Sequence, residues 1–201
     1  MKKIILSAAA LFAFGFANAQ DATTSTEGGK GFSNGDIFIS GSLGFSSQST
    51  GDVKTNTFTI SPKVGFFLSD NIAIGGQIGY TSTKDEDGVS EDIKTNTFSV
   101  GAFGRYYATP ASDFSFFAEL GANYMTSKME QGSAEAKSNG FGIALSPGLS
   151  YFIGSNWALE ASIGALSYNT EKPDFDGAES TDTFGLNLNL TNVNVGVVYK
   201  F

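Results

Sequence analysis

Along most of the chain, apolar side chains occupy every second position, which is the period of a β-strand with one apolar face. In the last ten residues they fall at odd positions from Val193 to Phe201. In the stretch 58–66 they fall at even positions, and the odd positions hold Thr, Ser, Lys and Gly. The final residue is an aromatic that belongs to the pattern, whereas a soluble domain usually ends in a frayed polar tail. A soluble β-protein that ends on a strand is the alternative for this stretch alone.

The pattern predicts eight strands, and the connections between them alternate in length. The strands are expected near 36–47, 54–68, 72–83, 94–108, 114–126, 138–153, 156–168 and 182–201. Short turns are expected at 69–71, 108–113 and 154–156, and long polar loops near 47–53, 84–93, 127–137 and 169–181. The segment 54–60 returns at 94–100 and, more weakly, at 137–143 and 180–186, with spacings of 40, 43 and 43 residues. The repeated unit is therefore strand, turn, strand and loop.

The two faces of the predicted strands differ in the size of their side chains. One face carries large apolar residues, and the other carries mostly Gly, Ser, Thr and Ala, which suit the narrow interior of eight strands. The aromatic residues gather at two heights, with Phe58 and Tyr80 in an upper ring and Tyr151 and Trp157 in a lower one. Aromatic girdles of this kind lie at the two interfaces of a membrane. The sequence therefore predicts an all-β fold, an eight-stranded antiparallel up-and-down transmembrane β-barrel; a soluble up-and-down barrel, the alternative, places its large apolar residues inside.

The eighth predicted strand contains an irregularity. Its apolar positions are even from Phe184 to Leu190 and odd from Val193 to Phe201, so the two faces exchange. A β-bulge or a short break near Thr191 and Asn192 would restore the alternation.

The first residues have the pattern of a secretory signal peptide. Two lysines are followed by an apolar run over 4–16 and by the small residues Ala17 and Ala19 of a cleavage site. We expect residues 1–19 to be removed, 20–35 to form a flexible lead-in, and 36–201 to form the barrel. An N-terminal anchor helix is the alternative to cleavage.

The composition is informative mainly because two residue types with common catalytic and structural roles are absent. The chain has no His and no Cys, so it lacks disulfides and the His-assisted nucleophiles of outer-membrane hydrolases. We therefore expect no enzymatic activity, no catalytic residue and no cofactor. The net charge of −8 becomes −10 when the two lysines of the leader are removed, and so acidic a chain is a poor ligand for nucleic acid.

Four charged residues occupy the inward faces at one level in the lower half of the lumen. They are Lys63, Arg105, Glu119 and Glu160. Two cations and two anions at one height are expected to pair, because an unpaired charge in a partly dry interior is costly. The residues predict an internal salt-bridge network. This network could have either of two roles. It is a plug or gate that closes the lumen to ions, or it is a satisfied polar core that only stabilises the barrel.

Acidic residues gather in the segments 84–92 and 171–179. The run 85–88 lacks the alternating ligand spacing and the closing Glu of a calcium loop, so no metal site is predicted. We interpret both segments as solvated loops. Bridging by divalent cations to surface lipopolysaccharide is the alternative.

Taken with the signal peptide and the eight strands, the terminal Val-Tyr-Lys-Phe of residues 198–201 gives the chain a resemblance to a known family. It resembles the small eight-stranded outer-membrane barrels of the OmpA-transmembrane-domain and OmpX type. The resemblance implies the outer membrane of a Gram-negative bacterium, contact with its lipids and lipopolysaccharide, and insertion by the barrel-assembly machinery, for which Val197, Tyr199 and Phe201 form the C-terminal signal. It implies a structural or surface-interaction role with an unidentified surface ligand; a small-solute or ion pore gated by the inner charges is the alternative. A closed barrel has no free edge, so we expect a monomer.

Overall fold

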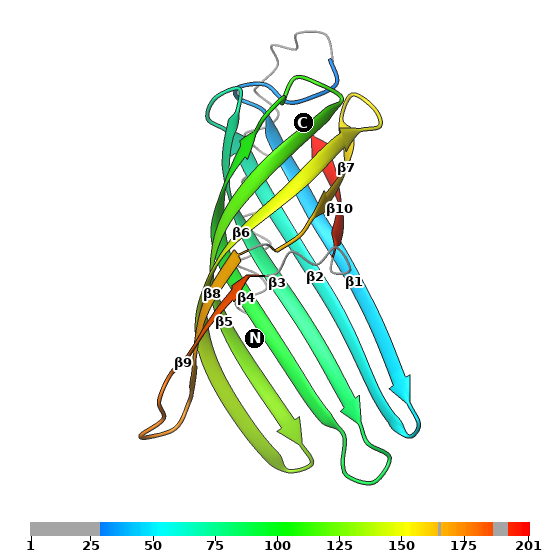
Figure 1. The fold of residues 1–201 in the computed structure, drawn as a ribbon, viewed down its shortest axis with the longest axis vertical. Coiled ribbons are helices and arrows are strands. Elements are labelled where there is room, and N and C mark those ends of the chain that lie inside the picture. The colour runs from blue at the N-terminus through cyan, green and yellow to red at the C-terminus, as the bar shows by residue number, and fades with distance from the viewer. Residues whose placement is uncertain (1–28, 165, 187–192) are drawn as a thin grey trace.

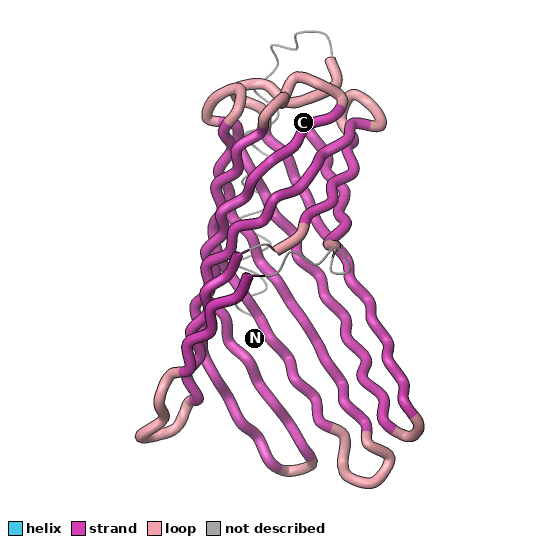
Figure 2. Tube along the Cα trace, in the orientation of Figure 1, coloured by secondary structure: helices cyan, strands magenta, loops and turns pink. Residues whose placement is uncertain are grey.

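The structure consists of β-strands joined by short connections (Figures 1 and 2). This computed structural model describes residues 29–164, 166–186 and 193–201. Its strands are β1 (Ile37–Thr50), β2 (Val53–Phe67), β3 (Ile72–Glu86), β4 (Ile93–Tyr107), β5 (Phe114–Gln131), β6 (Ala134–Phe152), β7 (Trp157–Ser162), β8 (Leu166–Pro173), β9 (Thr181–Leu186) and β10 (Asn194–Lys200). Over this part of the chain, no helix is long and apolar enough to cross a membrane.

The strands form a closed antiparallel barrel with eight strand positions. β1 to β6 pair in sequence order, β6 pairs with β7, β7 pairs with β10, and β10 pairs with β1 to close the ring. β8 follows β7 along the same edge of β6, and β9 pairs with β8. The eight-stranded antiparallel barrel is thus confirmed. The strands predicted at 156–168 and 182–201 are each divided in two, into β7 with β8 and β9 with β10.

One extra residue explains the division of the seventh position. On β6, Gly148 pairs with Ser162 of β7, and Leu145 pairs with Leu166 of β8. Three steps along β6 therefore correspond to four steps along its neighbour, which is the two-against-one count of a β-bulge. Sequence reasoning missed this break. The break that it expects near residues 191 and 192 lies outside the described residues.

At one end of the barrel the strands continue as long β-hairpins, where the sequence analysis expects polar loops (Figure 1). β1 and β2 pair up to a turn at 51–52, and β5 and β6 pair up to a turn at 132–133, so the loops predicted at 47–53 and 127–137 are wrong. Polar cross-strand pairs stabilise these ladders without apolar burial. The Ser47 hydroxyl donates to Asn56 Oδ1 at 2.7 Å, and Lys128 Nζ lies 2.8 Å from Glu135 Oε2. The other end carries short turns, and we call the two ends the hairpin end and the turn end.

Large apolar side chains cover the outer face between the two ends. Leu120 is 57% exposed and Ile74 is 46% exposed, although both lie within paired strands. Near the turn end, aromatic rings contact one another on this face. The centroids of Trp157 and Tyr199 are 4.8 Å apart, and those of Tyr199 and Phe201 are 5.0 Å apart. An apolar outer surface with an aromatic margin suits a lipid environment.

Replacing Leu120 by Arg should lower the free energy of unfolding in lipid vesicles by about 2–4 kcal/mol, because a charge midway along the lipid-facing side of a strand loses its hydration. The matched control is Val89→Arg, since Val89 is 93% exposed in the β3–β4 connection. Urea titration followed by the fluorescence of Trp157, the single tryptophan, measures both variants. Equal stability of the two would contradict the assignment of this face to lipid.

Candidate functional site in the barrel interior

Four charged side chains meet inside the barrel toward its turn end, and we call Lys63, Arg105, Glu119 and Glu160 the charge layer. They come from β2, β4, β5 and β7. Arg105 and Glu119 are directly opposite each other on the β4–β5 ladder, and Arg105 Nη2 lies 2.6 Å from Glu119 Oε2. Arg105 Nη1 lies 2.7 Å from Glu160 Oε1, and Lys63 Nζ donates a hydrogen bond to Glu119 Oε1. The structure thus brings the four residues singled out in the sequence into one connected network.

The guanidinium of Arg105 is the centre of this layer. Only 4% of the residue is exposed, and Nε and Nη2 both donate to Glu119 Oε2, at 3.0 and 2.6 Å. Nη1 donates to the hydroxyl of Tyr107 at 2.7 Å, and that hydroxyl donates to Glu160 Oε1 at 3.2 Å. The guanidinium carbon lies 4.2 Å from the ring centroid of Phe117, within reach of a cation–π interaction. Pairing on several sides is what makes a buried cation tolerable.

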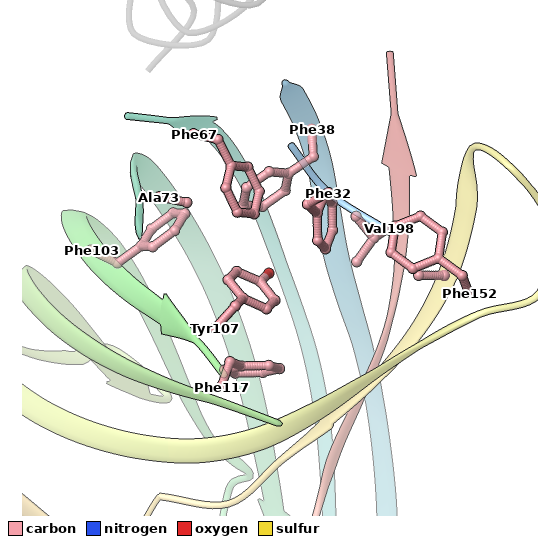
Figure 3. Packing of buried hydrophobic residues seen from close by; sticks show 10 residues of the cluster. Phe32, Phe38, Phe67, Ala73, Phe103, Tyr107, Phe117, Phe152 and Val198 are labelled. Atoms are coloured by element: carbon pink, nitrogen blue, oxygen red, sulfur yellow. The ribbon is translucent and has the colours of Figure 1, made fainter. Parts of the chain in front are cut away.

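An aromatic layer fills the lumen between the charge layer and the turn end (Figure 3). It consists of inward-pointing rings from five strands: Phe38, Phe67, Tyr107, Phe117 and Phe152. The ring centroids of Phe67 and Tyr107 are 5.2 Å apart, and those of Tyr107 and Phe117 are 5.5 Å apart. These are the separations of packed aromatic pairs, so the layer shields the charges from water at the turn end.

Sequence reasoning missed the aromatic layer because it considered only the aromatics of the membrane girdles and left these five inward rings unassigned. A signal was present, since two aromatic residues are adjacent at 66–67, 106–107, 116–117 and 151–152, each time near the turn end of a strand. Neighbours on a strand point to opposite faces, so one of each pair must point inward. Phe66 is 42% exposed and Phe67 is fully buried, as this rule requires.

A segment ahead of β1 covers the aromatic layer from the turn end, and we call residues 29–36 the strap. Phe32 of the strap is 1% exposed. Its ring stacks on Phe67 at 4.7 Å between centroids and meets Phe152 edge-on at 4.8 Å. The flexible lead-in expected over 20–35 therefore does not describe residues 29–35; residues 20–28 lie outside the described part. A lone Phe in a segment rich in Gly and Ser offered no pattern that would predict its burial.

On the hairpin side of the charge layer, the lumen holds a polar cavity of about 300 Å³. Its walls carry hydroxyl and amide groups, including Ser61, Ser99 and Ser146. Gln77 Nε2 donates to Asn123 Oδ1 at 2.7 Å within this wall. The charge layer forms the floor, with two cations and two anions.

The acidic β3–β4 connection, residues 87–92, is held by its own side chains. Asp87 Oδ1 accepts hydrogen bonds from the backbone N–H groups of Ser90 at 2.7 Å and Val89 at 3.0 Å. These bonds favour the charged form and lower the pKa of Asp87. Lys84 Nζ lies 2.7 Å from Asp92 Oδ2. Among the described residues, no group of three or more His, Cys, Asp or Glu side chains is placed to bind a metal ion.

The other residues predicted to matter lie toward the chain ends. Val197 and Tyr199 of the expected assembly signal lie in β10, where it pairs with β1, and Phe201 comes directly after β10. The backbone N–H of Phe201 donates to the carbonyl of Ile37 at 3.0 Å, so the last residue belongs to the closing ladder. Ala17 and Ala19, the expected cleavage site, lie outside the described residues.

Replacing Glu119 by Gln should lower the free energy of unfolding by about 3–5 kcal/mol, because the buried Arg105 and the part-buried Lys63 both lose a carboxylate partner and only Glu160 remains to pair with Arg105. The matched control is Glu130→Gln, which breaks a half-exposed pair with Lys128 at 2.6 Å. A pair of that kind contributes only about 0–1 kcal/mol. Urea titration of both refolded variants gives the comparison, and equal losses would argue against a buried network.

The Asp87 carboxylate should titrate below the usual range of an aspartate. Because its folded-state pKa is lowered, the hydrogen bonds to the loop persist at neutral pH and are lost only as the pH falls through that lowered pKa. An NMR titration that follows the amide protons of Val89 and Ser90 measures the midpoint. In Asp87→Asn those shifts should not titrate. A midpoint at or above the ordinary aspartate value would refute the loop geometry.

Comparisons with known proteins bear on this geometry. No curated protein matches the chain. Among solved structures, Neisserial surface protein A is similar, with a TM-score of 0.52 and 18% identity over 82% of this chain and 97% of that one. The outer membrane protein OprG from Pseudomonas aeruginosa is similar, with a TM-score of 0.51 and 16% identity over 85% of this chain and 98% of that one. At such identities these similarities show the fold alone.

A family model agrees with the fold over nearly the whole sequence. The model described as "Outer membrane protein beta-barrel domain" matches residues 6–201. The closed ring of strands, the apolar outer face and the aromatic margin are what such a domain requires. The chain belongs to the outer membrane protein beta-barrel domain family, an outer-membrane family of Gram-negative bacteria.

Proposed function

We propose that this protein is a non-enzymatic outer-membrane barrel with a closed lumen, whose hairpin end serves as its working surface in a structural or surface-interaction role. The observation that carries the proposal is the succession of the charge layer and the aromatic layer along the lumen. Both inward carboxylates, Glu119 and Glu160, bond to Arg105, so neither is a free acid or base. That arrangement supports a role without catalysis.

Two unlike barriers in series oppose the passage of an ion. In the charge layer, an ion must compete with the hydrogen bonds that Arg105 already makes to both carboxylates. In the aromatic layer, it meets packed rings, and the hydroxyl of Tyr107 is already bonded to Arg105 and Glu160, so little is available to replace its water. A constriction of this kind conducts ions only if water fills the aromatic layer or its side chains rearrange.

The hairpin end offers groups that a partner could bind. Phe175 is 67% exposed in the connection between β8 and β9, and Val89 is 93% exposed in that between β3 and β4. Charged residues, such as the pair of Lys128 and Glu135, also lie on the strand ends there. Apolar groups set among polar ones are the usual composition of a recognition surface.

The proposal includes export and assembly. Residues 1–19 act as a signal peptide that is cleaved after Ala19, and the assembly machinery reads Val197, Tyr199 and Phe201 at the end of the chain. The apolar outer face then contacts membrane lipids and lipopolysaccharide, and the barrel works as a monomer. The leader pattern and the outward apolar residues of β10 support this part.

A small-solute pore is the second candidate, and the polar cavity favours it. The cavity of about 300 Å³ reaches down to the charge layer, so a solute that enters from the hairpin end would meet a floor of paired charges. Transport would require both layers to open.

The refolded mature chain should be electrically silent in a planar lipid bilayer. The double variant Lys63→Met with Glu119→Gln should also be silent, because the aromatic layer remains beneath the altered charges. Adding Phe38→Ala and Phe117→Ala should produce ion-conducting events, since both layers are then disrupted. Single-channel recording measures all three proteins.

A heat-dependent shift in gel mobility verifies that each protein has folded and inserted before its silence is interpreted. Steady open events in the unaltered protein would overturn the closed lumen and support the pore. Opening by the charge-layer variant alone would show that the aromatic layer is no second barrier.

A further inference from the structure

The strap connects the two strands that close the ring. It leads directly into β1, and Lys200 at the end of β10 donates from Nζ to the carbonyls of Gly31 at 2.6 Å and Gly29 at 3.3 Å. The same ammonium lies 3.7 Å from Asp36 Oδ2, immediately ahead of β1. A single cation on β10 therefore holds the backbone that enters β1.

We call the ladder between β1 and β10 the seam. In the part of the chain that the structure describes, it runs from Phe38 with Lys200 to Ser42 with Gly196. On its other side, β10 pairs with β7 from Asn194 with Ser162 to Tyr199 with Trp157. The seam also joins strands from opposite ends of the chain, so it forms only when the ring closes.

The pocket that receives Phe32 is complete only in the closed ring. Its ring centroid is 4.7 Å from that of Phe67, 4.8 Å from Phe152, 5.1 Å from Tyr107 and 5.6 Å from Phe38. These partners belong to β2, β6, β4 and β1. Figure 3 shows Val198 of β10 beside Phe152, on the same side of Phe32. No pair of neighbouring strands could form this pocket alone.

The strap also fits the β4–β5 turn closely. Gly31 has a φ of +102°, and a Cβ there would lie 2.5 Å from the carbonyl oxygen of Pro110, so only glycine is accommodated. The N–H of Phe32 donates to that same carbonyl at 2.7 Å. Lys30 Nζ lies 3.0 Å from Asp113 Oδ2 in the same turn. These contacts fix the strap in one conformation across the mouth of the barrel.

We propose that the strap is a lock for the seam, which docks after β10 has paired with β1 and then opposes the reopening of that ladder. Docking and seam closure are linked, because Lys200 reaches the carbonyls of the strap only when β10 is in place. Linkage is reciprocal, so a docked strap must stabilise the closed seam as much as the closed seam stabilises docking. The lock acts in assembly and retention of the barrel, whether or not the lumen conducts.

Hydrogen exchange of the folded barrel in lipid vesicles tests the lock. In Phe32→Ala, the paired amides of residues 38–42 and 196–200 should exchange about tenfold faster than in the unaltered protein, because local opening of the seam is easier. Amides paired between β3 and β4 at 78–80 and 98–100 should keep their rates. Phe32→Leu keeps an apolar side chain but loses the ring contacts, so this variant should retain the fold. Exchange at the same amides should accelerate in it too, but by less than in Phe32→Ala.

Gly31→Ala and Gly29→Ala form the matched control. A Cβ at Gly31 meets the backbone of Pro110, whereas nothing lies within 4 Å of one at Gly29, so only Gly31→Ala should accelerate exchange at the seam. Acceleration by the same factor in every ladder would mean that the strap adds only general stability, and the lock would be wrong. Unchanged exchange at the seam in both Phe32→Leu and Gly31→Ala would also overturn it.

Discussion

The charge of Arg105 is the constraint around which the interior is arranged. A guanidinium stays ionised in a protein, so a barrel that places one in its lumen must surround it with acceptors. Glu119 and Glu160 supply them from different strands, and Phe117 supplies a ring face. These partners lie on β5 and β7, and Arg105 lies on β4. The ion pairs therefore form only when these three strands have the register seen in the structure.

The same arrangement makes stability and closure inseparable. Removing a charge from the layer disturbs the ladders that hold it, and removing a ring from the aromatic layer opens space in the packed part of the lumen. A channel with an independent gate would separate these roles, with a hinge that moves while the wall stays intact. Here the wall and the proposed barrier share residues, which supports the proposed role of a barrel that displays its hairpins rather than one that opens and closes.

The fold was predictable from the sequence because alternation with a period of two is a local signal. The charge layer was predictable for the same reason, since charged residues on inward faces stand out among Gly, Ser and Thr. The strap was not, because Phe32 is buried by rings from four strands that are distant in sequence. The break between β7 and β8 was missed because one extra residue leaves no mark in composition. The hairpins are not predictable from an apolar pattern, because polar pairs stabilise their ladders.

The strap brings residues near both ends of the described chain together, with Lys200 Nζ 2.6 Å from the Gly31 carbonyl. Neighbouring ends are the geometric condition for circular permutation. A permuted chain that begins in the turn at 132–133, and in which a short linker joins residue 201 to residue 29, would retain every other connection of the barrel. The new ends of the permuted chain would lie at the hairpin end. A peptide fused to them would therefore be displayed on the opposite side of the membrane from residues 29 and 201.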